Sequence, residues 1–168
     1  MPQSIFSYFL WVVFLVALQV LVGNHIHFLN YATPMIYVYA LLMLPTNTPH
    51  WVQLILGFAL GLVVDLFANT PGLSASALLV VALLKPYILQ VFAPSERDDD
   101  ALTPSIKSME WGGFTRYIVS MIFIYCLIFY NIEAFGFFNF KHITLSVIAS
   151  TTLSTLIILG FERLRYRN

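Results

Sequence analysis

Long apolar runs alternate with short polar connections along most of this chain. Six of these runs approach the length of about 20 residues that an α-helix needs to cross a bilayer. They predict transmembrane helices at residues 5–22, 27–44, 51–68, 73–92, 114–135 and 142–161. The runs are continuously apolar, whereas the strands of a membrane barrel alternate apolar and polar positions. The pattern therefore predicts an all-α integral membrane protein.

One connection is longer and more polar than the others. Residues 93–113 carry five acidic and two basic side chains, together with Pro94, Pro104 and the pair Gly112-Gly113. We expect a solvated, mostly acidic linker that separates a four-helix part from a C-terminal hairpin. The first run lacks a preceding basic region and a small-residue exit, so we expect a retained span and not a cleaved signal peptide. The predicted organisation is a single six-helix membrane domain over residues 1–168.

Composition supports the membrane assignment. The 168 residues are 60% hydrophobic and only 10% charged, whereas a soluble domain carries about 25% charged residues. The formal net charge is zero, so no basic field favours binding of nucleic acid. The one cysteine, Cys126, lies within the fifth run and cannot form a disulfide within the chain.

The basic residues predict the orientation of the spans. With six spans, both termini lie on one side of the membrane, and Lys and Arg near span ends mark the cytoplasmic side. Six of them fall on the side of the termini, and only Lys141 falls on the other: Arg97, Lys107, Arg116, Arg163, Arg165 and Arg167. We therefore expect both termini and the 93–113 linker to be cytoplasmic.

A single carboxylate is the most informative feature of the apolar runs. Asp65 is the first formal charge in the chain, and it lies inside the third run, where an ionised group is costly. Gly57, Gly61, Asp65 and Asn69 are spaced by four and therefore share one helix face. The glycine pair has the G-x-x-x-G spacing that permits close packing of two helices.

The residues after Asp65 suggest how its charge is accommodated. Thr70 and Pro71 resemble the N-cap and first position of the fourth helix, followed by Gly72. Free backbone amides at that helix start, with the positive end of the helix dipole, can neutralise a carboxylate. Asp65 is then a structural clamp of the turn between spans three and four. Binding of a ligand, an ion or a partner is the alternative.

Two further polar features lie within the apolar runs. Lys85 precedes Pro86, which breaks one hydrogen bond and bends the fourth helix; Lys85 is expected to extend towards the cytoplasmic surface or to contact a partner. Ser146, Ser150 and Ser154 are spaced by four on the sixth run. Small hydroxyl residues on one face favour close helix packing, either inside the protein or against a partner.

Nothing in the sequence indicates an enzyme. The chain shows no paired carboxylates, no histidine near a nucleophile and no glycine-rich phosphate loop. His25 and His27 are two residues apart, which places them on different helix faces and disfavours a metal site. We expect no catalytic residue, no metal and no cofactor.

These residues resemble the rod shape-determining protein MreD family along nearly the whole chain. The densest block is Gly57-Phe58-x-x-Gly61-Leu62-x-x-Asp65-Leu66-Phe67, followed by Thr70-Pro71-Gly72 and the small residues Ala75 and Ala77. The remaining matches are Ala32-Thr33-Pro34 with Tyr37 and Tyr39, Leu44-Pro45, Lys85-Pro86 and Glu133-Ala134-Phe135. The family commonly has Arg before the proline of span four, so Lys85 keeps the charge without the bidentate geometry of Arg.

The resemblance implies a non-enzymatic membrane scaffold of the bacterial cell-elongation complex. Its implied location is the bacterial inner membrane, and its implied direct partner is the periplasmic scaffold MreC. The wider complex would include the MreB filament, the RodA glycosyltransferase and a penicillin-binding transpeptidase, and would support peptidoglycan synthesis and cell shape. The six-helix fold of the family is similar to the substrate-binding subunits of energy-coupling-factor transporters. The alternative function is therefore a vitamin-like small-molecule binding subunit of a membrane transporter, which predicts a polar cavity near Asp65 and residues 69–76.

Overall fold

Helices are the only regular secondary structure in the described part of the chain. We analysed a computed structural model, which describes residues 5–19, 33–92, 104, 106–134 and 140–167. These residues form α1 (Ile5–Leu18), α2 (Val38–Leu42), α3 (His50–Ala68), α4 (Leu73–Phe92), α5 (Ile106–Glu133) and α6 (Phe140–Arg167). No strand occurs in these ranges.

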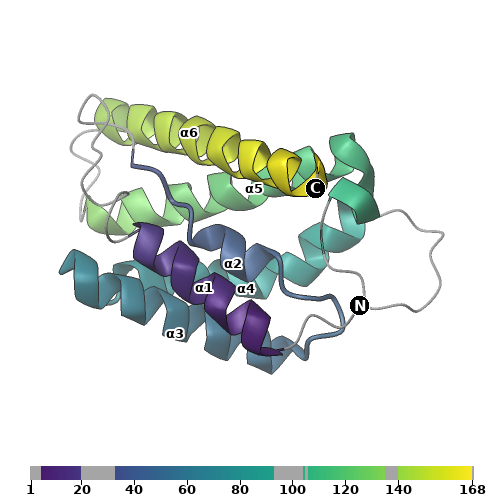
Figure 1. The fold of residues 1–168 in the computed structure, drawn as a ribbon. Helices are drawn as coiled ribbons and strands as arrows, with labels where there is room; N and C mark the ends of the chain where they lie inside the picture. The colour runs from purple at the N-terminus through teal and green to yellow at the C-terminus, as the bar shows by residue number, and fades with distance from the viewer. Residues whose placement is uncertain (1–4, 20–32, 93–103, 105, 135–139, 168) are drawn as a thin grey trace.

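The long helices pack in chain order. Helix α3 packs on α4, α4 on α5, and α5 on α6, while the short helix α2 contacts α1, α3 and α4. Figure 1 shows α2 in the middle of the bundle, with α1 lying across it. Helix α1 begins, and α6 ends, at the same end of the bundle.

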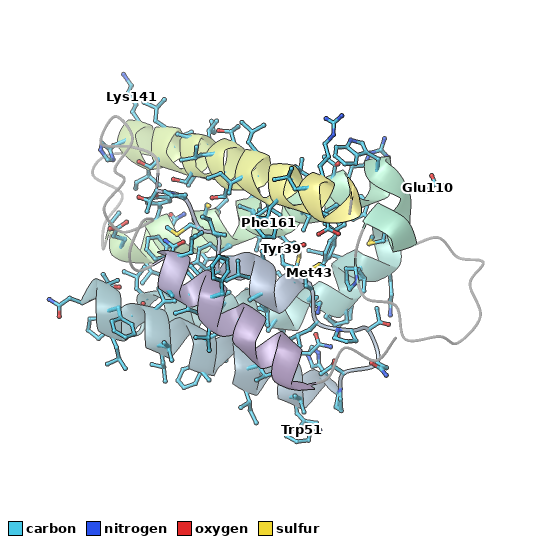
Figure 2. All side chains as sticks on the ribbon, in the orientation of Figure 1. Tyr39, Met43, Trp51, Glu110, Lys141 and Phe161 are labelled. Carbon is cyan, nitrogen blue, oxygen red and sulfur yellow. The ribbon has the colours of Figure 1, made fainter. Side chains whose placement is uncertain are left out.

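Four helices are long and apolar enough to cross a membrane: His50–Ala68, Leu73–Phe92, Met109–Glu133 and Lys141–Leu164. Their outward faces carry large exposed apolar side chains, which lipid can cover, such as Leu66, Phe67, Tyr87, Val91 and Leu156. Figure 2 places Trp51 and Glu110 at one end of the bundle and Lys141 at the opposite end. The chain therefore has the features of a multi-pass membrane protein.

The predicted spans agree best with the structure in the middle of the chain. Helix α4 has the predicted bounds, and α3 begins one residue before the predicted 51–68. The predicted linker 93–113 is too long, because α5 already begins at Ile106 and passes through a break at Glu110 (φ 59°, ψ 162°). Gly113, expected to belong to a loop, lies against the end of α4, where an added Cβ would come 3.2 Å from the Phe92 carbonyl oxygen. Helix α6 also extends beyond the predicted 142–161.

The first two predicted spans need correction. Helix α1 covers Ile5–Leu18 of the predicted 5–22, and residues 20–22 lie outside the described ranges. The prediction of a helical span over 27–44 is wrong within the described residues, because residues 33–37 are not helical and α2 holds only Val38–Leu42. Pro34 explains the break: proline lacks an amide donor and disfavours helical geometry in the residue before it. Residues 27–32 lie outside the described part.

The core surrounds this broken segment. Every residue from Pro34 to Leu44 is buried. Large side chains from α5, including Phe114, Tyr117 and Tyr125, are also fully buried in the same apolar cluster. Buried backbone inside a membrane protein must find hydrogen-bond partners within the protein. The non-helical stretch before α2 therefore requires polar side chains from its neighbours.

Candidate functional site at the α3–α4 turn

Asp65 lies in the last turn of α3 and is 2% exposed. Its Oδ1 accepts a hydrogen bond from the Ser74 amide (2.8 Å), and its Oδ2 accepts one from the Ala75 amide (3.0 Å). The Thr70 hydroxyl donates a third bond to Oδ1 (3.2 Å). Ser74 and Ala75 are in the first turn of α4, where amides lack partners within the helix and the helix dipole is positive. The Asp65 side chain, which belongs to α3, thus caps the start of α4.

The turn geometry depends on two residues with positive φ. Asn69 ends α3 in the left-handed conformation (φ 57°, ψ 35°), and its amide and that of Thr70 both donate to the Asp65 carbonyl oxygen. Gly72 has φ 84°, which is readily adopted only by glycine. Pro71 is exposed between them. Helix α4 begins at Leu73, so the expectation that Thr70 and Pro71 are its N-cap and first position is wrong.

The two glycines of α3 permit the close approach of α4. A Cβ added to Gly61 would lie 2.4 Å from the Ala75 Cα and 2.6 Å from its amide nitrogen. A Cβ added to Gly57 would meet the Ala82 Cβ and the Leu78 carbonyl oxygen at 3.3 Å. The contact at Gly61 is therefore backbone against backbone, and it brings the Ser74 and Ala75 amides to Asp65.

Lys85 lies inside the bundle, which corrects the expectation that it extends towards the cytoplasmic surface. It is 1% exposed, and its Nζ donates to the carbonyl oxygens of Leu41 (3.1 Å) and Leu44 (2.8 Å). The Tyr117 hydroxyl donates to the Leu42 carbonyl oxygen (3.3 Å). Leu41 and Leu42 end α2, and Leu44 follows it by two residues. Carbonyls at a helix end have no partner within the helix. Pro86 lies within α4, directly after the lysine.

The serine stripe of α6 binds the backbone on the other side of the break. Ser150 Oγ accepts from the Thr33 amide (3.0 Å), and Ser154 Oγ accepts from the Met35 amide (2.9 Å). The Gln19 side chain accepts from the Ile36 amide (3.0 Å). Of the two alternatives for this stripe, the structure supports internal packing for Ser150 and Ser154. Ser146 is also buried, but it lines a cavity beside the α3–α4 turn.

A cavity of about 630 Å³ adjoins the α3–α4 turn. Its lining comes from four helix ends, with Thr70 and Ser74 from the turn, Tyr130 and Glu133 from the end of α5, and Ser146 from the start of α6. Gln19 and three residues of the non-helical stretch, Thr33, Met35 and Tyr37, also line it. Asp65 is not among the lining residues; its carboxylate is held behind Ser74 by the amides.

Sequence reasoning missed two buried contacts. The Tyr39 hydroxyl donates to Glu162 of α6, and the hydroxyls of Tyr37 and Tyr125 share a hydrogen bond. Figure 2 shows Tyr39 beside Met43 and Phe161, between α2 and the last turns of α6. Glu162 lies eight residues after Ser154, so it continues the four-residue spacing of the serine stripe. That spacing is the signal that could have revealed it.

The described residues contain no group of three or more His, Cys, Asp or Glu side chains that could hold a metal ion. Cys126 is buried with a free thiol. The arrangement at the turn provides hydrogen bonds that join α3 and α4. Comparisons with protein-family models, with curated proteins and with solved structures found no match to this chain.

Proposed function

We propose that this protein is a non-enzymatic membrane scaffold of the bacterial cell-elongation complex, of the MreD type, with MreC as its direct partner. The observation that carries the proposal is that the residues of the family-like block join helices α3 and α4 to each other. Gly61 permits the contact, Asp65 caps α4, and Gly72 shapes the turn. A scaffold needs residues that fix its fold in this way, because it binds its partners through its outward helix faces.

The proposed topology has six spans, with 5–22 and 27–44 inserted beside the four long helices and both termini in the cytoplasm of a bacterial inner membrane. The distribution of Lys and Arg supports this orientation. Helix α2 would then be a buried piece of a broken span, which is tolerated at membrane depth where protein surrounds it. MreB, RodA and a penicillin-binding transpeptidase would belong to the wider complex.

Co-purification with MreC of the same organism tests the scaffold proposal. The tagged protein is expressed with MreC, extracted in mild detergent and isolated through the tag, with an unrelated single-span membrane protein as the control bait. We expect MreC, and not the control, to elute at a constant ratio with the tagged protein. A folded, monodisperse protein that leaves MreC in the flow-through would refute the proposal.

A second candidate function is a small-molecule binding subunit of a membrane transporter. The cavity beside the α3–α4 turn favours it, because ligand pockets have volumes of about 300–1,000 Å³. Such a subunit would co-purify with a transporter's energising module from the native membrane instead of with MreC. Isolation of the tagged protein from its native membrane, followed by mass spectrometry of all bound proteins, therefore distinguishes the two candidates.

A further inference from the structure

We propose that the cavity at the α3–α4 turn binds an uncharged aromatic molecule. The proposal goes beyond the scaffold function and is independent of it, since binding is measured on the purified chain without MreC. If the second candidate function is correct, the same molecule represents the ligand class of the transporter subunit. The argument depends on the size of the cavity, on its aromatic walls and on the interactions of its polar groups.

The cavity has a buried floor and an exposed rim. Met35 and Tyr37 line it at 3% and 1% exposure, whereas Phe67 lines it with an exposure of 65%. Its volume of about 630 Å³ falls within the range of about 300–1,000 Å³ that is typical of ligand pockets. A dry cavity of about 150 Å³ holds one benzene ring. This cavity therefore has room for a ligand of roughly two fused rings with a short polar arm.

Aromatic side chains form much of the described lining: Tyr37, Phe67, Phe129 and Tyr130. Phe129 and Tyr130 are nearly perpendicular, with ring centroids 5.4 Å apart, and Phe129 also packs against the buried Tyr125 at 5.8 Å. These contacts hold the two rings in place before a ligand arrives, which lowers the cost of binding. Aromatic rings gain more from edge-to-face or offset contacts with another aromatic ring than from burial alone. The walls therefore favour an aromatic ligand over a saturated one of the same size.

The polar groups around the floor already bond within the protein. The Tyr37 hydroxyl is paired with that of Tyr125, and the Tyr130 hydroxyl is 2.7 Å from Ser150 Oγ. Gln19 accepts a hydrogen bond from a backbone amide. No lining residue is among the buried side chains that have an atom without a hydrogen-bond partner in the described part of the chain. The floor therefore offers packing surface, and a polar group of the ligand belongs at the rim.

The charged groups near the cavity favour an uncharged ligand. Glu133 and His142 lie exposed at the rim, and each already interacts with another group of the protein. The Asp65 carboxylate, behind the lining, accepts three hydrogen bonds. No Lys or Arg occurs among the described lining residues. A charged ligand of either sign would have to disrupt one of these interactions or enter unpaired, and both are costly.

Compounds with one two-ring skeleton test the ligand class. Naphthylmethanol is uncharged and aromatic, decahydronaphthylmethanol is its saturated analogue, naphthylmethylamine is cationic and naphthoate is anionic. Isothermal titration of the purified protein in lipid nanodiscs, with empty nanodiscs as the reference, measures each Kd. We expect naphthylmethanol to bind with a Kd below about 1 mM, the charged compounds at least about tenfold more weakly, and the saturated analogue at least about threefold more weakly. No saturable binding of naphthylmethanol, or equally tight binding of any of the other compounds, would overturn the proposal.

Two adjacent residues of α3 provide a matched pair of variants. Phe67 and Leu66 are both exposed, at 65% and 81%, but only Phe67 lines the cavity. Phe67→Ala should weaken the binding of naphthylmethanol by at least about threefold, and Leu66→Ala should leave it unchanged. Replacement of exposed side chains has little effect on the fold. Equal effects of the two substitutions would show that the compound binds elsewhere and would refute the site.

A second pair of variants closes the cavity at its mouth. Ala134 is exposed and lines the cavity directly after α5, whereas Ile132 is exposed on the same helix end outside the lining. Ala134→Trp should weaken the binding of naphthylmethanol by at least about tenfold, and Ile132→Trp should leave it unchanged. Thermal unfolding shows whether each variant is folded. Full binding by a folded Ala134→Trp variant would overturn the proposal.

Discussion

Replacement of Asp65 tests the clamp most directly, because its carboxylate has three protein donors. The Asp65→Leu substitution keeps a side chain of similar size but leaves the amides of Ser74 and Ala75 without an acceptor. A buried donor without a partner costs about 1–3 kcal/mol. Two such donors lower the free energy of unfolding by about 4 kcal/mol. Asp65→Asn retains one acceptor oxygen and should cost about half as much.

Thermal unfolding of the purified variants in detergent provides the measurement. A domain of this length loses about 2–4 °C in Tm per kcal/mol, so we expect a decrease of roughly 10 °C for Asp65→Leu and about half of that for Asp65→Asn. Thr70→Val calibrates the scale, because it removes only the longest of the three bonds, at 3.2 Å. Equal decreases for the Asn and Leu variants would show that charge, and not hydrogen-bond acceptance, is required, and would refute the clamp.

Three further substitutions test the other internal contacts by the same thermal unfolding. Gly61→Ala should destabilise the protein by about 1–3 kcal/mol, because the added Cβ would overlap the backbone of α4. Gly160→Ala is the control and should be neutral or slightly stabilising, because nothing lies within 4 Å of its added Cβ. Similar losses of stability in the two variants would contradict the close contact. Lys85→Met should cost about 2 kcal/mol, since the Leu44 carbonyl loses the lysine donor and the Leu41 carbonyl keeps only the Leu44 amide. An unchanged Tm would show that the lysine does not hold α2. Ser154→Ala removes the acceptor of a buried amide and should cost about 1–3 kcal/mol, while Thr152→Ala, whose hydroxyl bonds only carbonyls of its own helix, should stay within about 0.5 kcal/mol.

The parts of the fold that the sequence predicts are those governed by local rules. Helix α4 has its predicted bounds, and the amides that bind Asp65 come from the adjacent helix, only nine and ten residues further along. The length of an apolar run and the spacing of Gly61 and Asp65 are sufficient for such features. The start of α4 was predicted at the wrong residue because the Thr70 hydroxyl donates to the Asp65 carboxylate and does not cap the amides of α4.

The missed features depend on contacts between distant segments. The stretch before α2 is apolar enough to predict a helix, yet its Thr33 and Met35 amides bind serines 117 and 119 residues away. Pro34 signals a kink, but no local rule tells a kinked helix from a stretch that leaves the helical conformation altogether. Lys85 was misplaced for the same reason, because its acceptors, the carbonyls of Leu41 and Leu44, belong to that broken segment.

The broken segment also explains why so many polar groups lie inside an apolar bundle. Backbone donors and acceptors at membrane depth must be satisfied within the protein, and each interruption of a helix creates such groups. Asp65 accepts a hydrogen bond from an amide at the start of α4, and Lys85 donates one to a carbonyl at the end of α2. Ser154 accepts one from an amide of the stretch before α2. These residues need no further role to account for their burial.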